Sequence, residues 1–70
     1  MGKLAETGFG AFAEECERAG FEVEPYRGRD GRERPAVRCD RDRQVVEVIR
    51  ATTGKVAWER FEGGYVVYPA

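Results

Sequence analysis

The chain has 70 residues, 12 of them basic and 13 acidic, and a formal net charge of −1. Because so short a chain forms only one small domain, it cannot hold a doubly wound nucleotide-binding sheet or a two-domain enzyme cleft. The sequence lacks histidine, which excludes mechanisms that need an imidazole base or ligand. We therefore treat residues 1–70 as a single small domain whose net charge does not favour nucleic acid.

The charges are unevenly distributed along the chain. Residues 6–24 contain six glutamates and one arginine, whereas residues 27–43 contain seven arginines and four acidic residues. We therefore expect an acidic helix on one side of the molecule and a basic loop on another. The two cysteines, Cys16 and Cys39, fall on the apolar sides of expected elements, and we expect buried thiols rather than a disulfide. Reduced thiols indicate a cytoplasmic setting, and the short apolar runs predict no membrane span.

The first expected element is an amphipathic helix over about residues 8–19, preceded by a lead-in at residues 1–7 that we expect to be loose or disordered. Apolar side chains recur there with the helical period, at Phe9, Phe12, Ala13, Cys16 and Ala19. Thr7 is the expected N-cap. Gly20 is expected to end the helix in a left-handed conformation, and Phe21 to fold its apolar side chain back on the helix.

Residues 21–39 alternate between apolar and charged side chains on either side of Arg29-Asp30-Gly31, which predicts a β-hairpin. A two-residue Asp-Gly turn would set Arg27 opposite Arg34, and like charges would then meet. A three-residue loop with Gly31 left-handed shifts the register by one residue. We predict this second register. It pairs Phe21 with Cys39, Glu22 with Arg38, Val23 with Val37, Pro25 with Pro35, Tyr26 with Arg34, and Arg27 with Glu33.

The remaining residues are expected to form further strands. Residues 44–50 predict a central strand, because four β-branched apolar side chains leave only Glu47 clearly outward. Residues 56–61 and 65–68 predict two more strands, separated by glycine-containing turns. The sequence thus predicts an α+β fold, with an N-terminal helix packed on a four- to five-stranded antiparallel sheet connected as an α-β-β-β-β-β meander.

The motifs that resemble catalytic or cofactor sites lack the context that such sites need. Residues 8–13 spell a loose glycine-rich dinucleotide fingerprint, but no strand precedes it. The Thr-Gly-Lys at residues 53–55 lacks the first glycine and the following helix of a phosphate loop. Cys16 has no basic neighbour in sequence that would activate it. We expect no catalytic residue, metal ligand or cofactor, and we interpret Glu14, Glu15 and Glu17 as a solvated helix face.

Two features predict binding to a macromolecule. The first is the arginine-rich hairpin, whose candidate binding residues are Arg29, Arg32, Arg34 and Tyr26. The second is a surplus of apolar side chains on the sheet face away from the single expected helix, among them Tyr26, Ala36, Val45 and Ile49. Such a face is either an interface or the inside of a strongly curled sheet that buries both sides.

These features lead to a non-enzymatic intracellular protein-interaction module or regulator as the first functional hypothesis, with another protein or a second copy of the chain as its partner. The alternative is a nucleic-acid-binding protein that uses the arginine-rich hairpin. A small-molecule site between helix and sheet near Trp58 ranks last, because the core is too small to spare a cavity.

Overall fold

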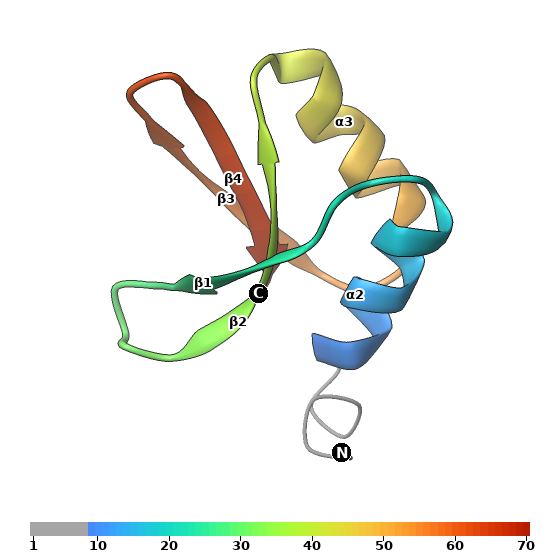
Figure 1. Ribbon diagram of the computed structural model, residues 1–70, viewed down its shortest axis with the longest axis horizontal. Coiled ribbons are helices and arrows are strands. Elements are labelled where there is room, and N and C mark those ends of the chain that lie inside the picture. Colours follow the sequence, from blue (N-terminus) through green and yellow to red (C-terminus); the bar gives the residue numbers. More distant parts are fainter. Residues whose placement is uncertain (1–8) are drawn as a thin grey trace.

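The computed structural model describes residues 9–70, which form two helices and one four-stranded sheet (Figure 1). In chain order the elements are α2 (Phe9–Arg18), β1 (Glu24–Arg27), β2 (Glu33–Cys39), α3 (Asp42–Ala51), β3 (Val56–Phe61) and β4 (Gly64–Pro69). The α+β class and the antiparallel sheet are confirmed, and four strands lie within the expected range. The expected loose lead-in at residues 1–7 and its Thr7 cap lie outside the described residues.

Helix α2 buries one apolar stripe and ends as expected. Phe9, Phe12 and Cys16 are its buried residues, spaced by three and four positions. Gly20 has a φ of 96°, and its N–H donates to the carbonyl oxygen of Glu17 at 3.0 Å. The N–H of Phe21 donates to the carbonyl oxygen of Cys16 at 2.9 Å. These two bonds satisfy the last carbonyls of the helix, which only a left-handed residue at position 20 allows.

The β1–β2 hairpin has the predicted register. Pro25 pairs with Pro35, Tyr26 with Arg34, and Arg27 with Glu33. Gly31 has a φ of 78°, and its N–H donates to the carbonyl oxygen of Gly28 at 3.0 Å. The ladder begins only at Glu24, so the pairs predicted at residues 21–23 are not formed. Phe21 and Val23 instead pack against the core from the segment between helix and strand.

The prediction of a central strand at residues 44–50 is wrong, because these residues form helix α3. Val45 and Val48 are buried, whereas Val46 is 45% exposed, a pattern that follows the helical period rather than strand alternation. The side chain of Gln44 starts the helix, since its Oε1 accepts the N–H groups of Asp40 (2.6 Å) and Arg41 (3.1 Å). These contacts offset the strand propensity of the β-branched residues.

The strand order differs from the predicted meander. The sheet runs β1-β2-β4-β3, so the last strand of the described chain lies between β2 and β3. In a meander, strands that are consecutive in sequence lie side by side. Here α3 connects β2 to β3, and β4 lies between these two strands. Gly64 begins β4 where the strand passes close to β2: a Cβ atom there would lie 2.3 Å from the carbonyl oxygen of Cys39.

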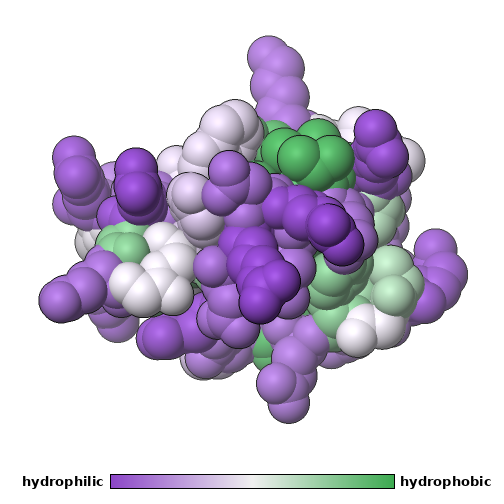
Figure 2. Space-filling view, turned by 90° about the horizontal axis from the view of Figure 1, so that it is seen from above, coloured by the Kyte–Doolittle hydropathy of each residue, from purple (hydrophilic) through white to green (hydrophobic). Residues whose placement is uncertain are grey.

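Both helices lie on the same face of the sheet and cover its two central strands, β2 and β4 (Figure 1). The main core lies between the helices and the sheet. It contains Phe12, Cys16, Val37, Cys39, Val45, Val48 and Val67. Neither described helix has the length and apolar character that crossing a membrane would require. Seen from the end where α3 begins, the surface is largely hydrophilic, with small separate hydrophobic areas (Figure 2).

Candidate functional site

The sheet face opposite the helices is curled, and we call it the concave face, formed by Tyr26, Ala36, Arg38, Glu59, Phe61, Val66 and Tyr68. Its two edges meet through side chains. The hydroxyl of Tyr26 on β1 donates to Oε1 of Glu59 on β3 at 2.7 Å, although these strands are the opposite edges of the sheet. The ring of Tyr26 also stacks on that of Tyr68, with centroids 5.2 Å apart.

The strongly curled sheet that the sequence offered as one alternative is present over part of this face, while another part forms an open hollow. Near the Tyr26–Tyr68 stack, Ala36, Val66 and Tyr68 are buried and form a second, smaller core. The β1–β2 and β3–β4 hairpins diverge from one another (Figure 1), and part of the face between them is hollowed. The surplus apolar residues differ from those expected, since Val45 and Ile49 belong to α3 and pack on the helix side.

A hollow of about 210 Å³ lies in the open part of the concave face. Its floor includes Ala36, which has no exposed surface, and Val66, which is 5% exposed. Phe61 lies at its side and is 39% exposed. Charged side chains complete the lining, namely Glu24, Arg38, Glu59 and Arg60. An apolar floor within a charged rim is the usual arrangement of a protein-binding surface.

Glu59 holds the closed end of the concave face through two tyrosines. Its Oε2 accepts the hydroxyl of Tyr68 at 2.8 Å, in addition to the bond from Tyr26. These two hydrogen bonds lower the pKa of Glu59, because they favour the charged carboxylate. The bond to Glu59 raises the pKa of Tyr26, and burial followed by the same carboxylate raises that of Tyr68. The arrangement fixes a charged acceptor between two neutral phenols.

Arg38 lies across the open end of the hollow. Its Nε is 2.9 Å from Oε2 of Glu24 on the neighbouring strand, and its guanidinium carbon is 5.6 Å from the centre of the Phe61 ring. The side chain is still 69% exposed, so the guanidinium keeps donors for a further acceptor. The ion pair predicted between Arg38 and Glu22 is formed with Glu24 instead, because the ladder begins at Glu24.

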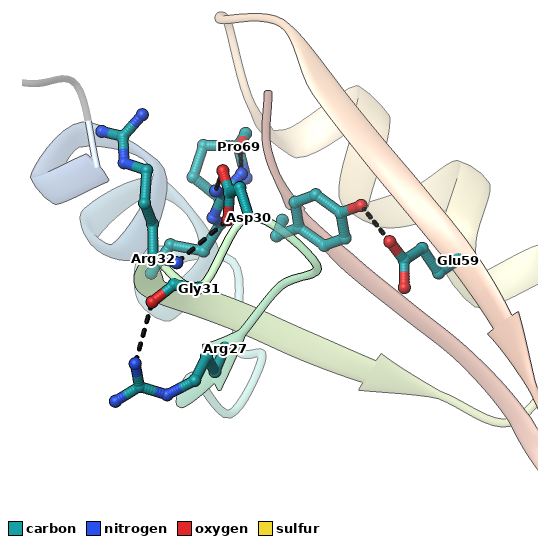
Figure 3. A network of polar contacts seen from close by, with 8 residues as sticks. Arg27, Asp30, Gly31, Arg32, Glu59 and Pro69 are labelled. Atoms are coloured by element: carbon teal, nitrogen blue, oxygen red, sulfur yellow. Dashed lines mark hydrogen bonds and ion pairs between the residues drawn. The ribbon is translucent and has the colours of Figure 1, made fainter.

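Two of the four predicted binding residues, Arg34 and Tyr26, make internal contacts. Arg34 is only 9% exposed and pairs with Asp30, while its Nη1 donates to the carbonyl oxygen of Pro69 at 3.4 Å. Its guanidinium also lies over the rings of Phe9 and Tyr68. Figure 3 draws this polar network, with dashed lines at the bonds to Asp30 and to Glu59.

The other two predicted residues, Arg29 and Arg32, remain at the exposed hairpin tip. The guanidinium carbon of Arg32 is 5.6 Å from the centre of the Phe9 ring, which fixes that side chain against α2. The N–H of Arg32 donates to Oδ1 of Asp30 at 3.0 Å, and this bond is the main cause of the lowered pKa of Asp30. Nη1 of Arg27 donates to the carbonyl oxygen of Gly31 at 2.8 Å (Figure 3). The tip is therefore a stabilised hairpin end at which Arg29 is exposed.

Sequence reasoning missed Glu59, Arg38 and Phe61 as residues of one surface. They come from two strands that are not adjacent in the sheet, and only the β1-β2-β4-β3 order with its curl brings them together. The alternation within residues 56–61 already places Glu59 and Phe61 on one face of a strand. Trp58, expected beside a site between helix and sheet, lies on the other face of the edge strand β3 and is 53% exposed.

The described residues also give no indication of a metal centre or a reactive thiol. Within residues 9–70, no group of three or more potential metal-ligating side chains comes together. Cys16 and Cys39 are free thiols buried in the main core. Burial raises the pKa of Cys16 to about 11 and raises that of Cys39 as well, which makes both poor nucleophiles.

Comparison of the chain with protein-family models, with curated proteins and with solved structures found no significant match.

Proposed function

We propose that this chain is a non-enzymatic protein-interaction module that binds another protein through its concave face. The observation that carries the proposal is the open hollow on the sheet face that neither helix covers. Phe61 and the apolar floor offer a site for an apolar side chain of the partner, and Arg38 offers donors for an acceptor beside it. The setting that we propose is cytoplasmic, a view supported by the two free thiols in the core.

Affinity capture from cells of the source organism tests this function. The bait would be the full chain, compared with a double variant, Arg38→Glu with Phe61→Ser, that changes only exposed side chains of the concave face. Val46→Ser is the matched control, because it removes from α3 an apolar side chain of similar exposure to Phe61, 45% against 39%. We expect at least about a tenfold loss of the captured partner with the double variant and none with the control. Equal capture by all three proteins would contradict the proposal, provided that circular dichroism shows them folded.

The second candidate function is nucleic-acid binding by the hairpin, and it now depends on Arg29 and Arg32. The observation in its favour is that both are exposed residues of the hairpin loop, which directly follows the exposed Arg27. Binding of mixed-sequence nucleic acid, measured at low and moderate salt, should weaken steeply with salt if phosphate contacts dominate. Arg29→Ala with Arg32→Ala should abolish such binding, whereas the concave-face variant should retain it. Lack of binding at low salt would exclude this function.

A further inference from the structure

Strand β3 forms one edge of the sheet, and its outer side has no backbone partner among residues 9–70. It bonds only to β4, runs for six residues and contains no proline. The opposite edge, β1, runs for four residues and contains Pro25, which lacks an N–H. A regular, proline-free edge is the one that can accept a further strand. The outward-pointing backbone groups of β3 are therefore available to such a strand.

The register with β4 determines which groups of β3 point outward. A two-residue turn at 62–63 closes the hairpin, and at the other end Ala70 donates its N–H to the carbonyl oxygen of Lys55 at 3.0 Å. In an antiparallel pair, hydrogen-bonded positions alternate with non-hydrogen-bonded ones, so residues 57, 59 and 61 bond to β4. The residues whose N–H and C=O groups point away from the sheet are Val56, Trp58 and Arg60.

We propose that β3 pairs with β3 of a second copy of this chain, antiparallel and about a twofold axis at Trp58. This register uses all three outward residues, because Trp58 meets Trp58 of the second copy and Val56 meets Arg60 on each side of the axis. It joins two sheets of four strands into one continuous sheet of eight. Shifting the register by two residues would move one of the three outward residues beyond the end of the partner strand.

The side chains of β3 are compatible with this pairing on both faces. On the concave side, Ala57 meets Glu59 of the second copy, so no like charges stand directly opposite. Glu59 is also held inward by its two tyrosines, away from the edge. On the other side, each Arg60 lies diagonal to Trp58 of the second copy, within reach of a cation–π contact. The strand is therefore complementary to itself.

Trp58 explains why the contact would be stable. Its side chain projects from the helix-side face of β3, beyond the central strands that the helices cover, and is 53% exposed. Pairing about Trp58 places the two indole rings next to each other and removes apolar surface from water in both copies. Strand β3 also contributes Glu59, Arg60 and Phe61 to the lining of the concave hollow. Trp58 lies on the other face of β3 and Arg38 lies on β2, so substitutions at these two residues test the two contacts separately.

The single tryptophan of the chain reports directly on this contact. Sedimentation of the wild-type chain from micromolar to millimolar concentrations should show a monomer–dimer equilibrium, with a blue shift of tryptophan emission as the dimer forms. Amide hydrogen exchange should gain protection at Val56, Trp58 and Arg60 as concentration rises, while Ala57 and Glu59 are protected throughout. A strict monomer at millimolar concentration, or unchanged exchange at the three outward residues, would overturn the proposal.

Two variants separate this contact from non-specific association. Trp58→Glu sets two carboxylates face to face at the axis and should weaken the dimer at least about tenfold. Val46→Glu introduces the same charge at an exposed apolar residue of α3 and should leave the dimer unchanged. Equal weakening by both variants, or no weakening by Trp58→Glu in a protein that circular dichroism shows to be folded, would contradict pairing through β3.

Discussion

Arg34 contributes to the structure through several partners at once. Its guanidinium contacts Asp30 in the hairpin loop, the carbonyl oxygen of Pro69 at the end of β4, and the rings of Phe9 and Tyr68. A buried arginine stabilises through the packing of its stem as well as through its charge. This side chain therefore connects the hairpin tip to α2 and to the central strand of the sheet.

The first prediction concerns this residue. Arg34→Ala should lower the free energy of unfolding by about 2 kcal/mol, because it removes a side chain that is 91% buried together with two cation–π contacts. Arg29→Ala, which removes an exposed arginine of the same hairpin, should change the free energy of unfolding by less than about 0.5 kcal/mol. Urea unfolding followed by circular dichroism measures both. Equal effects of the two variants would mean that Arg34 is not a structural residue.

The second prediction concerns the three tyrosines of the chain, each of which donates its hydroxyl to a carboxylate. Tyr26 and Tyr68 bond to Glu59, and Tyr65 donates to Oδ1 of Asp42 at 2.7 Å. All three have a raised pKa. At Tyr26 and Tyr65 the bond to the carboxylate is the main cause, because it requires the neutral phenol, whereas at Tyr68 burial comes first and the bond second. These hydrogen bonds therefore contribute fully to stability at pH values below the ordinary pKa of tyrosine, about 10. The contribution is lost as pH rises through the higher pKa values of the tyrosines in the folded protein.

Absorbance of tyrosinate against pH measures this effect. The native protein should ionise its tyrosines at higher pH than the denatured protein, with circular dichroism showing that the fold persists. Glu59→Gln should bring the titration of Tyr26 closer to the ordinary value and leave that of Tyr65 unchanged, whereas Asp42→Asn should do the reverse. Coincident titration curves for native and denatured protein would contradict the two hydrogen-bonded clusters.

At the scale of elements, the hairpin and α3 show what the sequence could and could not predict. The hairpin register follows from local information, because a shift by one residue sets Arg27 opposite either Glu33 or Arg34. Helix α3 carries conflicting local signals. Four β-branched residues favour a strand, while the spacing of Val45 and Val48 favours a helix. The conflict is resolved by the cap from Gln44 and by packing against β2 and β4, which the sequence alone does not supply.

The third prediction distinguishes the two interpretations of this segment. In a strand, Val46 and Val48 would share a face and their truncation would have similar effects. In helix α3, Val48 is fully buried and Val46 is 45% exposed. Val48→Ala should therefore cost about 2 kcal/mol of stability, whereas Val46→Ala should be neutral or slightly stabilising because alanine favours helix. Chemical denaturation of both variants gives the comparison, and equal losses would argue against the helix.

The candidate site was less predictable than the elements. The sequence identified Tyr26 and Arg34 by residue type, but their burial depends on Tyr68 and Phe9, which are distant in the sequence. The concave hollow depends on a strand order that local patterns do not encode. The sequence around Arg34 does not reveal its burial. An arginine with an acidic partner four residues away, such as Asp30, can be exposed or buried.

At the scale of the whole molecule, the main core contains both cysteines, which are among its largest fully buried side chains. Cys16 and Cys39 are 0% and 2% exposed, from α2 and β2 respectively. Their access to solvent therefore requires the helix layer to separate from the sheet. In so small a domain this separation amounts to unfolding of the whole described structure.

The fourth prediction follows from this burial. Both thiols should react with a thiol reagent at least about a thousandfold more slowly in the native protein than in the unfolded one. The pKa of about 11 at Cys16 adds to this protection, because little thiolate forms near neutral pH. As the urea concentration increases, the reaction rates of the two thiols should converge on a common rate that global unfolding determines. Reaction of either thiol at the unfolded rate without denaturant would show that the helix layer opens locally.

The place of β4 in the sheet has a consequence for how the chain acquires its structure. During synthesis, β4 is made after α2, the first hairpin, α3 and β3, yet β2 and β3 are joined only through it. Until β4 emerges, the first hairpin is a two-stranded ribbon, and such ribbons are only marginally stable in water. The sheet therefore assembles late, through contacts distant in sequence, and its folding should be slow compared with that of a helical protein of equal length.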